Sequence, residues 1–126
     1  MLVVAAVIEK GDRILICQRR RDSRHALKWE FPGGKVEPGE QPAGALAREL
    51  REELAIDAEI GDHLHRQDVR YGDGPIITLL FYRVTEFSGE PQNLQFEQIV
   101  WEHPRRLPDY DFLEGDRQFI RLLSSN

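Results

Sequence analysis

Cysteine is almost absent from this chain of 126 residues, and long hydrophobic runs are missing. The single cysteine, Cys17, cannot form a disulfide within the chain, which fits a reducing cytoplasm. No apolar run approaches the roughly 20 residues that cross a bilayer, so we expect no membrane partner. The apolar segment 2–8 has neither a positive flank nor a cleavage site, so it predicts a buried strand and not a signal peptide.

An excess of positive charge is also lacking. The formal net charge is −5 at pH 7, whereas proteins that bind nucleic-acid polymers usually present a basic surface, so we expect no such partner. The basic residues nevertheless gather in one stretch, just ahead of an acidic segment: Arg19, Arg20, Arg21, Arg24, Lys28 and Lys35. Basic residues beside a carboxylate cluster suit a metal–polyphosphate ligand. For Arg20, Arg21 and Arg24 taken singly, a solvated loop is the preferred interpretation.

The acidic segment contains three carboxylates at helical spacing. Glu49, Glu52 and Glu53 stand at i, i+3 and i+4, so they share one side of one helical turn. Like charges at this spacing cost a helix a few tenths of a kcal/mol per pair. A cation between the carboxylates would remove that cost, and Mg²⁺ is a cation that prefers oxygen ligands. A solvated helix face is the alternative for such a run taken alone.

The surrounding residues distinguish this run from an ordinary acidic helix. The segment 34–56 reads GKVEPGEQPAGALARELREELAI, with Gly34, Glu40, Arg48-Glu49 and Glu52-Glu53 at fixed offsets. This pattern resembles the signature of the Nudix hydrolases at every position except the last glycine, which is Ala55 here. The segments WEFPGGK (29–35) and IITLLF (76–81) are similar to the MutT branch of that family. The resemblance implies an α/β/α sandwich with a mixed sheet.

The local patterns predict the elements of a single domain spanning residues 1–126. We expect a hairpin over 2–9 and 13–19, a polar loop over 20–30, and turns at 31–34 and 38–39. A helix is predicted over 42–54 with a left-handed residue at Ala55, followed by strands at 57–71, 76–86 and 97–103 and a second helix over 115–123. The apolar stripe of the first helix leaves Glu49, Glu52 and Glu53 off the core face and consists of Ala43, Leu46, Ala47, Leu50 and Leu54.

The resemblance also implies the residues of a metal and phosphate site. Glu49, Glu52, Glu53 and the backbone carbonyl of Gly33 would bind the divalent metals. Arg48 would orient those carboxylates by a charge-assisted hydrogen bond. Glu40 would brace the loop against the helix, with a direct metal role as the alternative. Lys35, after the double glycine, would contact phosphate.

Further site residues lie outside the signature. Family members often add a base or outer metal ligand from a later loop, for which Glu97 is the best candidate and Glu90 and Glu102 are weaker ones. Arg19 corresponds to an arginine that contacts the nucleotide in MutT-like enzymes. Phe31 and Phe81 supply either an apolar wall for the base or plain core packing. Asp116 either reads the base edge or caps the second helix.

Together these features predict a Mg²⁺-dependent nucleoside triphosphate pyrophosphohydrolase, with Mn²⁺ as a substitute metal. The expected substrate is a modified or unusual nucleotide, either an oxidised guanine nucleotide or a cytosine nucleotide. The expected setting is nucleotide-pool sanitation in the cytoplasm by a monomer or homodimer. A nucleotide-sugar or dinucleoside-polyphosphate hydrolase is the alternative within the family. A non-catalytic nucleotide sensor is disfavoured, because such proteins usually lose signature carboxylates that persist here.

Overall fold

The apolar segment at the start of the chain becomes β1 (Leu2–Lys10), the strand around which the computed structural model is arranged. The structure describes residues 1–125. β1 pairs in parallel with β7 (Ile77–Val84) and antiparallel with β2 (Arg13–Gln18) and β4 (Gly33–Lys35). Residues 4–8 of β1 are all buried, as expected for a strand that is covered on both faces.

Alternation along β1 and β2 separates two hydrophobic cores. Val4, Ala6 and Ile8 point to one core together with Leu15 and Cys17. The intervening residues belong to the other core, because successive side chains of a strand lie on opposite faces; they are Ala5, Val7, Ile14 and Ile16.

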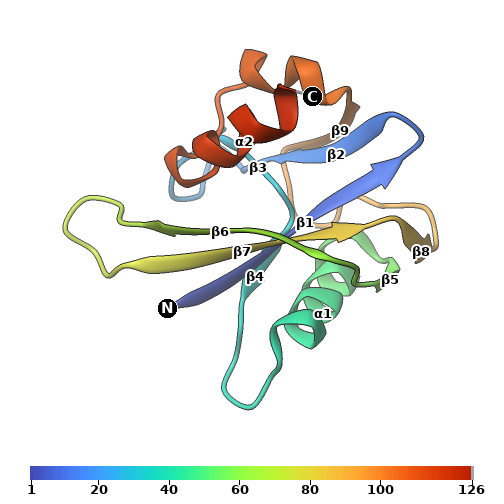
Figure 1. The fold of residues 1–126 in the computed structure, drawn as a ribbon, viewed down its shortest axis with the longest axis horizontal. Coiled ribbons are helices and arrows are strands. Elements are labelled where there is room, and N and C mark those ends of the chain that lie inside the picture. The colour runs from blue at the N-terminus through green and yellow to red at the C-terminus, as the bar shows by residue number, and fades with distance from the viewer. Residues whose placement is uncertain (126) are drawn as a thin grey trace.

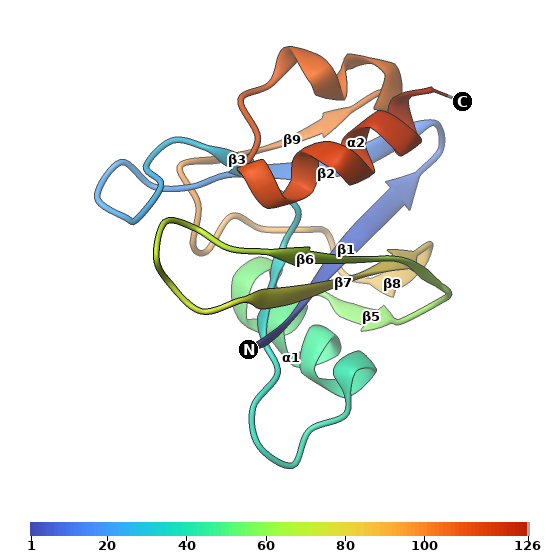
Figure 2. The same cartoon turned by 60° about the vertical axis from the view of Figure 1, so that its left-hand side comes forward.

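A helix covers each face of the sheet. α1 (Pro42–Leu54) packs against β1, β4 and β5 (Asp57–Glu59), and it contributes four apolar side chains to the first core: Ala45, Leu46, Leu50 and Leu54. α2 (Arg117–Ser124) contributes Phe119 and Ile120 to the second core. Figures 1 and 2 both show α1 and α2 on opposite sides of the strands.

The remaining strands extend the sheet and add a small second one. β3 (Trp29–Glu30) and β9 (Gln98–Glu102) pair with β2, and β6 (His63–Val69) pairs with β7. β5 pairs with β8 (Glu86–Ser88) in the two-stranded sheet. Two 3₁₀ helices, η1 (Pro104–Asp109) and η2 (Glu114–Asp116), lead into α2. The predicted α/β class with a mixed sheet is therefore confirmed. No helix in residues 1–125 is long and apolar enough to cross a membrane.

Several predicted boundaries are wrong. The strand expected over 57–71 is two strands, because the chain turns at Gly61, whose N–H donates to the Arg83 carbonyl at 2.8 Å. The strand expected over 76–86 ends at Val84 and resumes as β8. The end of the predicted loop 20–30 pairs as β3, and the predicted turn at 31–34 leads into β4.

The apolar face of α1 is also rotated from the predicted one. Ala43 is exposed, whereas Ala45 is fully buried. Glu53, expected off the core face, is only 9% exposed. Its burial is the first sign of an unusual site at this helix turn, because carboxylates are rarely buried without partners.

Candidate active site

Glu53 lies at the C-terminal turn of α1, where the helix meets the sheet. Its Oε1 accepts a hydrogen bond from the Gly33 N–H at 3.0 Å. Burial, reinforced by the nearby charges of Glu49 and Glu30, raises the pKa of Glu53 to about 9, and the Gly33 hydrogen bond only partly opposes this rise.

The double glycine lets the backbone approach both β1 and the acidic turn. A Cβ at Gly33 would lie 2.0 Å from the Val4 carbonyl oxygen, so only glycine fits there. A Cβ at Gly34 would lie 2.5 Å from the carboxyl carbon of Glu49. The Glu49 carboxylate thus rests directly against backbone, and its burial raises its pKa although Arg48 opposes the shift.

Arg48 holds the acidic turn to the preceding loop. Its Nη1 lies 3.0 Å from Glu49 and 3.3 Å from Glu52, while its Nε lies 2.7 Å from Glu40. Its Nη2 donates to Glu40 at 2.9 Å and to the Lys35 carbonyl at 3.1 Å. These contacts have the geometry of the predicted orienting role for Arg48 and of the predicted bracing role for Glu40. Hydrogen bonds from Arg48 and from the Glu37 N–H lower the pKa of Glu40 to about 2.

The donor set suits a hard divalent cation. Glu49, Glu52 and Glu53 offer carboxylate oxygens from one helical turn, and Gly33, whose N–H donates to Glu53, lies in the adjoining strand β4. Within residues 1–125, no three acidic, histidine or cysteine side chains already converge as a metal cluster. Arg48 lies against Glu49 and Glu52, and a cation would offset both the burial of Glu53, which is the main cause of its raised pKa, and the neighbouring charge of Glu49.

A cavity of about 400 Å³ opens beside Glu53. It brings together predicted metal, phosphate and base residues that lie far apart in the sequence: Arg19, Phe31, Gly33, Lys35, Glu53 and Asp116. Glu49 and Glu52, predicted with Glu53 as metal ligands, are not among its lining residues. Phe81 is not among its lining residues; it is fully buried, with its ring 4.4 Å from that of Phe119. Core packing is therefore the role that the structure gives Phe81, whereas Phe31 both packs in the core and lines the cavity.

Asp116 occupies the N-cap position of α2, as expected, but its side chain does not cap the helix. Its side chain makes no capping hydrogen bond, and its backbone is helical (φ −92°, ψ −14°) because η2 runs directly into α2. The capping alternative is therefore wrong. Asp116 is instead 6% exposed at the cavity wall. Burial and the Glu30 charge raise its pKa well above the usual range, although the Phe31 N–H donates to it.

Glu30 and Tyr71 line the cavity but were not among the predicted site residues. Glu30 pairs with Arg19 at 3.2 Å, yet burial still raises its pKa. The sequence could have indicated Glu30 as a site residue, because it lies inside the WEFPGGK segment between Trp29 and Phe31, which are both buried in the core. Tyr71 offered no signal of this kind, because it follows β6 in a loop of ordinary polar residues.

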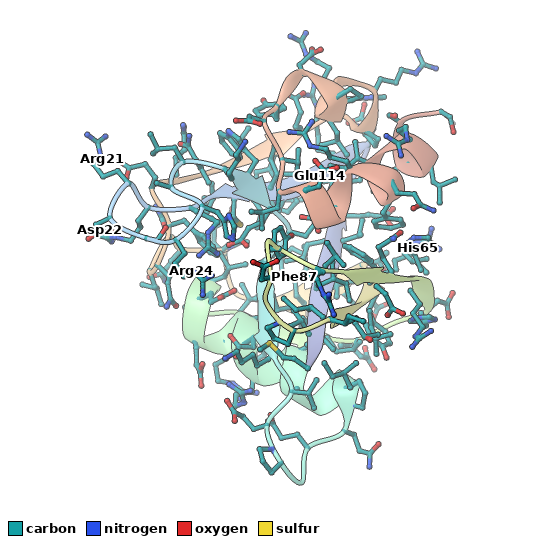
Figure 3. The ribbon with its side chains drawn as sticks, turned by 90° about the vertical axis from the view of Figure 1, so that its left-hand side faces the viewer. Arg21, Asp22, Arg24, His65, Phe87 and Glu114 are labelled. Atoms are coloured by element: carbon teal, nitrogen blue, oxygen red, sulfur yellow. The ribbon has the colours of Figure 1, made fainter. Side chains whose placement is uncertain are left out.

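The three carboxylates proposed from later loops lie apart from this cavity. Glu97 pairs with Arg21 at 3.2 Å, which lowers the pKa of Glu97. Figure 3 shows Arg21 and Asp22 at the outer tip of their loop. Glu90 is exposed and lies 3.8 Å from Lys10. Glu102 is buried between β9 and η1, where it accepts hydrogen bonds from Tyr110 at 2.5 Å and from the His103 N–H at 2.8 Å.

Comparison with known proteins places this arrangement in a family. Residues 1–123 match the NUDIX domain model. The chain is 42% identical over 116 residues to a CTP pyrophosphohydrolase of Escherichia coli K12, covering 90% of this chain and 84% of that protein. It is 39% identical over 126 residues to a putative 8-oxo-dGTP diphosphatase 2 of Mycobacterium tuberculosis, covering 94% and 84%. The crystal structure of a MutT NUDIX hydrolase from Burkholderia pseudomallei superposes with a TM-score of 0.85 at 30% identity, covering 95% of each chain. The chain therefore belongs to the Nudix hydrolase family.

Proposed function

We propose that this protein is a Mg²⁺-dependent nucleoside triphosphate pyrophosphohydrolase of the MutT type. One observation carries the proposal: a single cavity reaches from Glu53, on the acidic turn of α1, to Phe31 and Asp116. The first end suits metal-bound phosphates and the second suits a nucleobase. Relatives named for hydrolysis of CTP and of 8-oxo-dGTP support the same substrate class.

The acidic turn is the metal and phosphate end. Nudix hydrolases generally use divalent metal ions, and we assign Mg²⁺ here to Glu49, Glu52, Glu53 and the Gly33 carbonyl. A bound Mg²⁺ would neutralise phosphate charge and hold the attacking water. Arg48 keeps the carboxylates oriented, since it donates to both Glu49 and Glu52. Lys35 lines the cavity with an ammonium group that suits a phosphate oxygen.

The reaction exchanges one P–O bond for another. The oxygen of water forms a bond to phosphorus, the phosphoanhydride bond breaks, and the nucleoside monophosphate and pyrophosphate leave. A carboxylate must take the proton of the water. We keep Glu97 as the candidate for this role, because Glu53 is already assigned to the metal, although Glu97 is paired with Arg21 outside the cavity.

The opposite end would select the base. Asp116 offers carboxyl oxygens, Phe31 offers an apolar ring, and Arg19 is held in place by Glu30. A carboxyl group can accept from the amino or imino groups of cytosine or guanine. Cytosine nucleotides and oxidised guanine nucleotides are therefore our preferred substrates, and removal of damaged or unusual nucleotides in the cytoplasm is the proposed use. A nucleotide-sugar or dinucleoside-polyphosphate hydrolase remains the alternative within the family.

An assay of pyrophosphate release with Mg²⁺ tests this function. The panel contains the standard, oxidised and methylated nucleoside triphosphates, nucleotide sugars and dinucleoside polyphosphates. We expect monophosphate and pyrophosphate in equal amounts, with the highest kcat/KM for a cytosine or oxidised guanine nucleotide. Hydrolysis of only nucleotide sugars or dinucleoside polyphosphates would favour the alternative within the family. No hydrolysis of any compound in the panel would indicate a nucleotide-binding protein without this activity.

Glu53→Gln tests the metal assignment within the same assay. It removes the charge but keeps the size, so the fold should persist while kcat falls by about 10³-fold or more at saturating Mg²⁺ and nucleotide. Circular dichroism checks the fold. Glu59→Gln is the matched control, because Glu59 is exposed on β5 and does not line the cavity. A folded Glu53→Gln protein with near-normal turnover would contradict the assignment.

A further inference from the structure

Tyr71 reaches across the cavity wall from the loop after β6 to the segment that carries Asp116. Its hydroxyl oxygen accepts a hydrogen bond from the Gly115 N–H at 3.1 Å. The two residues are 44 positions apart, so the contact exists only in the folded chain. Both Tyr71 and Asp116 line the cavity.

Tyr71 can approach position 115 because glycine has no side chain there. A Cβ at Gly115 would lie 2.7 Å from the Tyr71 hydroxyl oxygen and 3.1 Å from both Leu79 and Val69. Any other residue at position 115 would push the hydroxyl away from the backbone. Gly115 is itself buried. The half-buried Tyr71 therefore holds its hydroxyl against the Gly115 backbone at the base end of the cavity.

The ring of Tyr71 also contacts the ring of His25, which is itself exposed. The two ring centroids are 4.8 Å apart, and His25 lines the same cavity. His25 and Leu27 have positive φ angles of 55° and 64°, a conformation that non-glycine residues adopt at a cost of order 1–3 kcal/mol. Figures 1 and 2 show this loop, between β2 and β3, on the same side of the molecule as the β6–β7 loop. Two loops thus meet over the cavity through these rings.

The hydroxyl of Tyr71 has a donor that no hydrogen bond within residues 1–125 uses. A phenol has one O–H donor besides its acceptor positions. Among the bonds formed within residues 1–125, the Tyr71 oxygen takes part as the acceptor from Gly115, and no protein acceptor takes its proton. Burial and the charges of Asp116 and Glu30 raise the pKa of Tyr71, so the donor persists at neutral pH. The cavity therefore contains a positioned O–H donor with no partner in the protein.

We infer that Tyr71 is a specificity-determining residue whose hydroxyl donates to an exocyclic carbonyl oxygen of the nucleobase. This inference rests on the proposed nucleotide hydrolysis and extends it. Cytosine, guanine and 8-oxoguanine each carry such an oxygen, whereas adenine carries none. Tyr71 and Asp116 would together read the base edge, the first as a donor beside the carboxyl group of the second. The Gly115 contact fixes their spacing.

Tyr71→Phe tests the inference, because it keeps the ring against His25 and removes only the hydroxyl. We expect kcat/KM to fall about tenfold for cytosine and 8-oxoguanine nucleotides, mainly through a higher KM, because tenfold is the size of one neutral hydrogen bond. Adenine nucleotides should change less than twofold. For nucleotides that are turned over too slowly, the dissociation constant is measured instead in a Glu53→Gln background, with and without Tyr71→Phe.

Tyr110→Phe is the matched control. Its hydroxyl is also hydrogen-bonded within the protein, to Glu102, but Tyr110 does not line this cavity. Its loss should lower the melting temperature without altering the ranking of nucleotides. If Tyr71→Phe lowers kcat/KM equally for all bases, adenine included, Tyr71 is a structural residue and the inference is overturned. An unchanged kcat/KM for every nucleotide would overturn it as well. If the wild-type protein hydrolyses no nucleotide, the proposed function fails instead.

Discussion

At the residue scale, Asp116 has an environment that changes what its carboxyl group can do. Burial and the Glu30 charge raise the pKa of Asp116, so its protonated form persists to higher pH than that of an exposed aspartate. A protonated carboxyl offers one donor and one acceptor, whereas an ionised one only accepts. Asp116 can therefore match a base edge that presents both kinds of group, such as the ring nitrogen and amino group of cytosine.

Asp116→Ala should change substrate preference and not only stability. The side chain makes no capping hydrogen bond. We therefore expect kcat/KM for the preferred nucleotide to fall by a factor equivalent to roughly 1–3 kcal/mol, while kcat/KM for poor substrates barely changes. Asp116→Asn, which keeps a donor and an acceptor but cannot ionise, should lose less. The measurement is the ranking of nucleotides by kcat/KM. Asp109→Ala, at an exposed position in η1, is the control, and an unchanged ranking in Asp116→Ala would exclude base reading.

Ala55 is a second residue whose backbone conformation decides its effect. It ends α1 with φ 57° and ψ 36°, as predicted from its place in the signature, where relatives have glycine. Ala55→Gly should therefore leave the free energy of unfolding unchanged or raise it by less than about 1 kcal/mol, because glycine removes the left-handed strain but enlarges the unfolded ensemble. Ala47→Gly, inside the helix, should instead lower it by about 1 kcal/mol or more. Urea unfolding measures both, and a clear loss for Ala55→Gly would contradict the strain argument.

The residues of the signature were predictable from sequence because their geometry is local. Glu49, Glu52 and Glu53 share one helical turn by spacing alone, and Arg48 lies beside them. The base end of the cavity is different, since Tyr71 meets Gly115 only through packing of β6 against η2. No local pattern carries such a contact.

At the element scale, the predictable features were those with strong periodicity or strong turn residues. The helix over 42–54 and the hairpin of β1 and β2 were correct, because Pro42 and the Gly11 turn mark their ends. The strands after α1 were merged in the prediction, since apolar and polar residues alternate through the Gly61 turn without a break. The true break is a tertiary hydrogen bond, from Gly61 to Arg83.

Glu102 ties two elements together and should make stability depend on pH. Hydrogen bonds from Tyr110 and the His103 N–H lower its pKa in the folded protein. Its ionised form therefore stabilises the fold above the unfolded pKa of about 4.3, and this contribution disappears as the pH falls through the folded pKa. Glu102→Gln should lower the free energy of unfolding by roughly 1–2 kcal/mol at pH 7. The difference from wild type should shrink below about pH 4.

Urea unfolding between pH 3 and pH 7 measures that difference. The control is Glu90→Gln, because Glu90 and its partner Lys10 are both exposed and an exposed pair contributes under about 1 kcal/mol. A Glu102→Gln deficit that stays constant from pH 7 to pH 3 would mean that the ionised carboxylate is not the stabilising species.

At the scale of the whole molecule, the cavity is assembled from segments that span nearly the entire chain, from Met1 to Asp116. A cation bound at Glu53 would therefore bind the folded protein and not the unfolded chain. Ligands of this kind stabilise by mass action, by about 2.7 kcal/mol at a concentration of one hundred times Kd. For a chain of this length, each kcal/mol raises the melting temperature by roughly 4 °C.

Addition of Mg²⁺ to metal-free protein should accordingly raise the melting temperature by several degrees, and EDTA should reverse the rise. Glu53→Gln should abolish most of the shift, because it removes the buried charge that the cation would neutralise, whereas Glu59→Gln should retain it. Differential scanning calorimetry without nucleotide separates metal binding from turnover. If Mg²⁺ raises the melting temperature of wild type and of Glu53→Gln equally, the metal binds elsewhere and Glu53 is not its ligand.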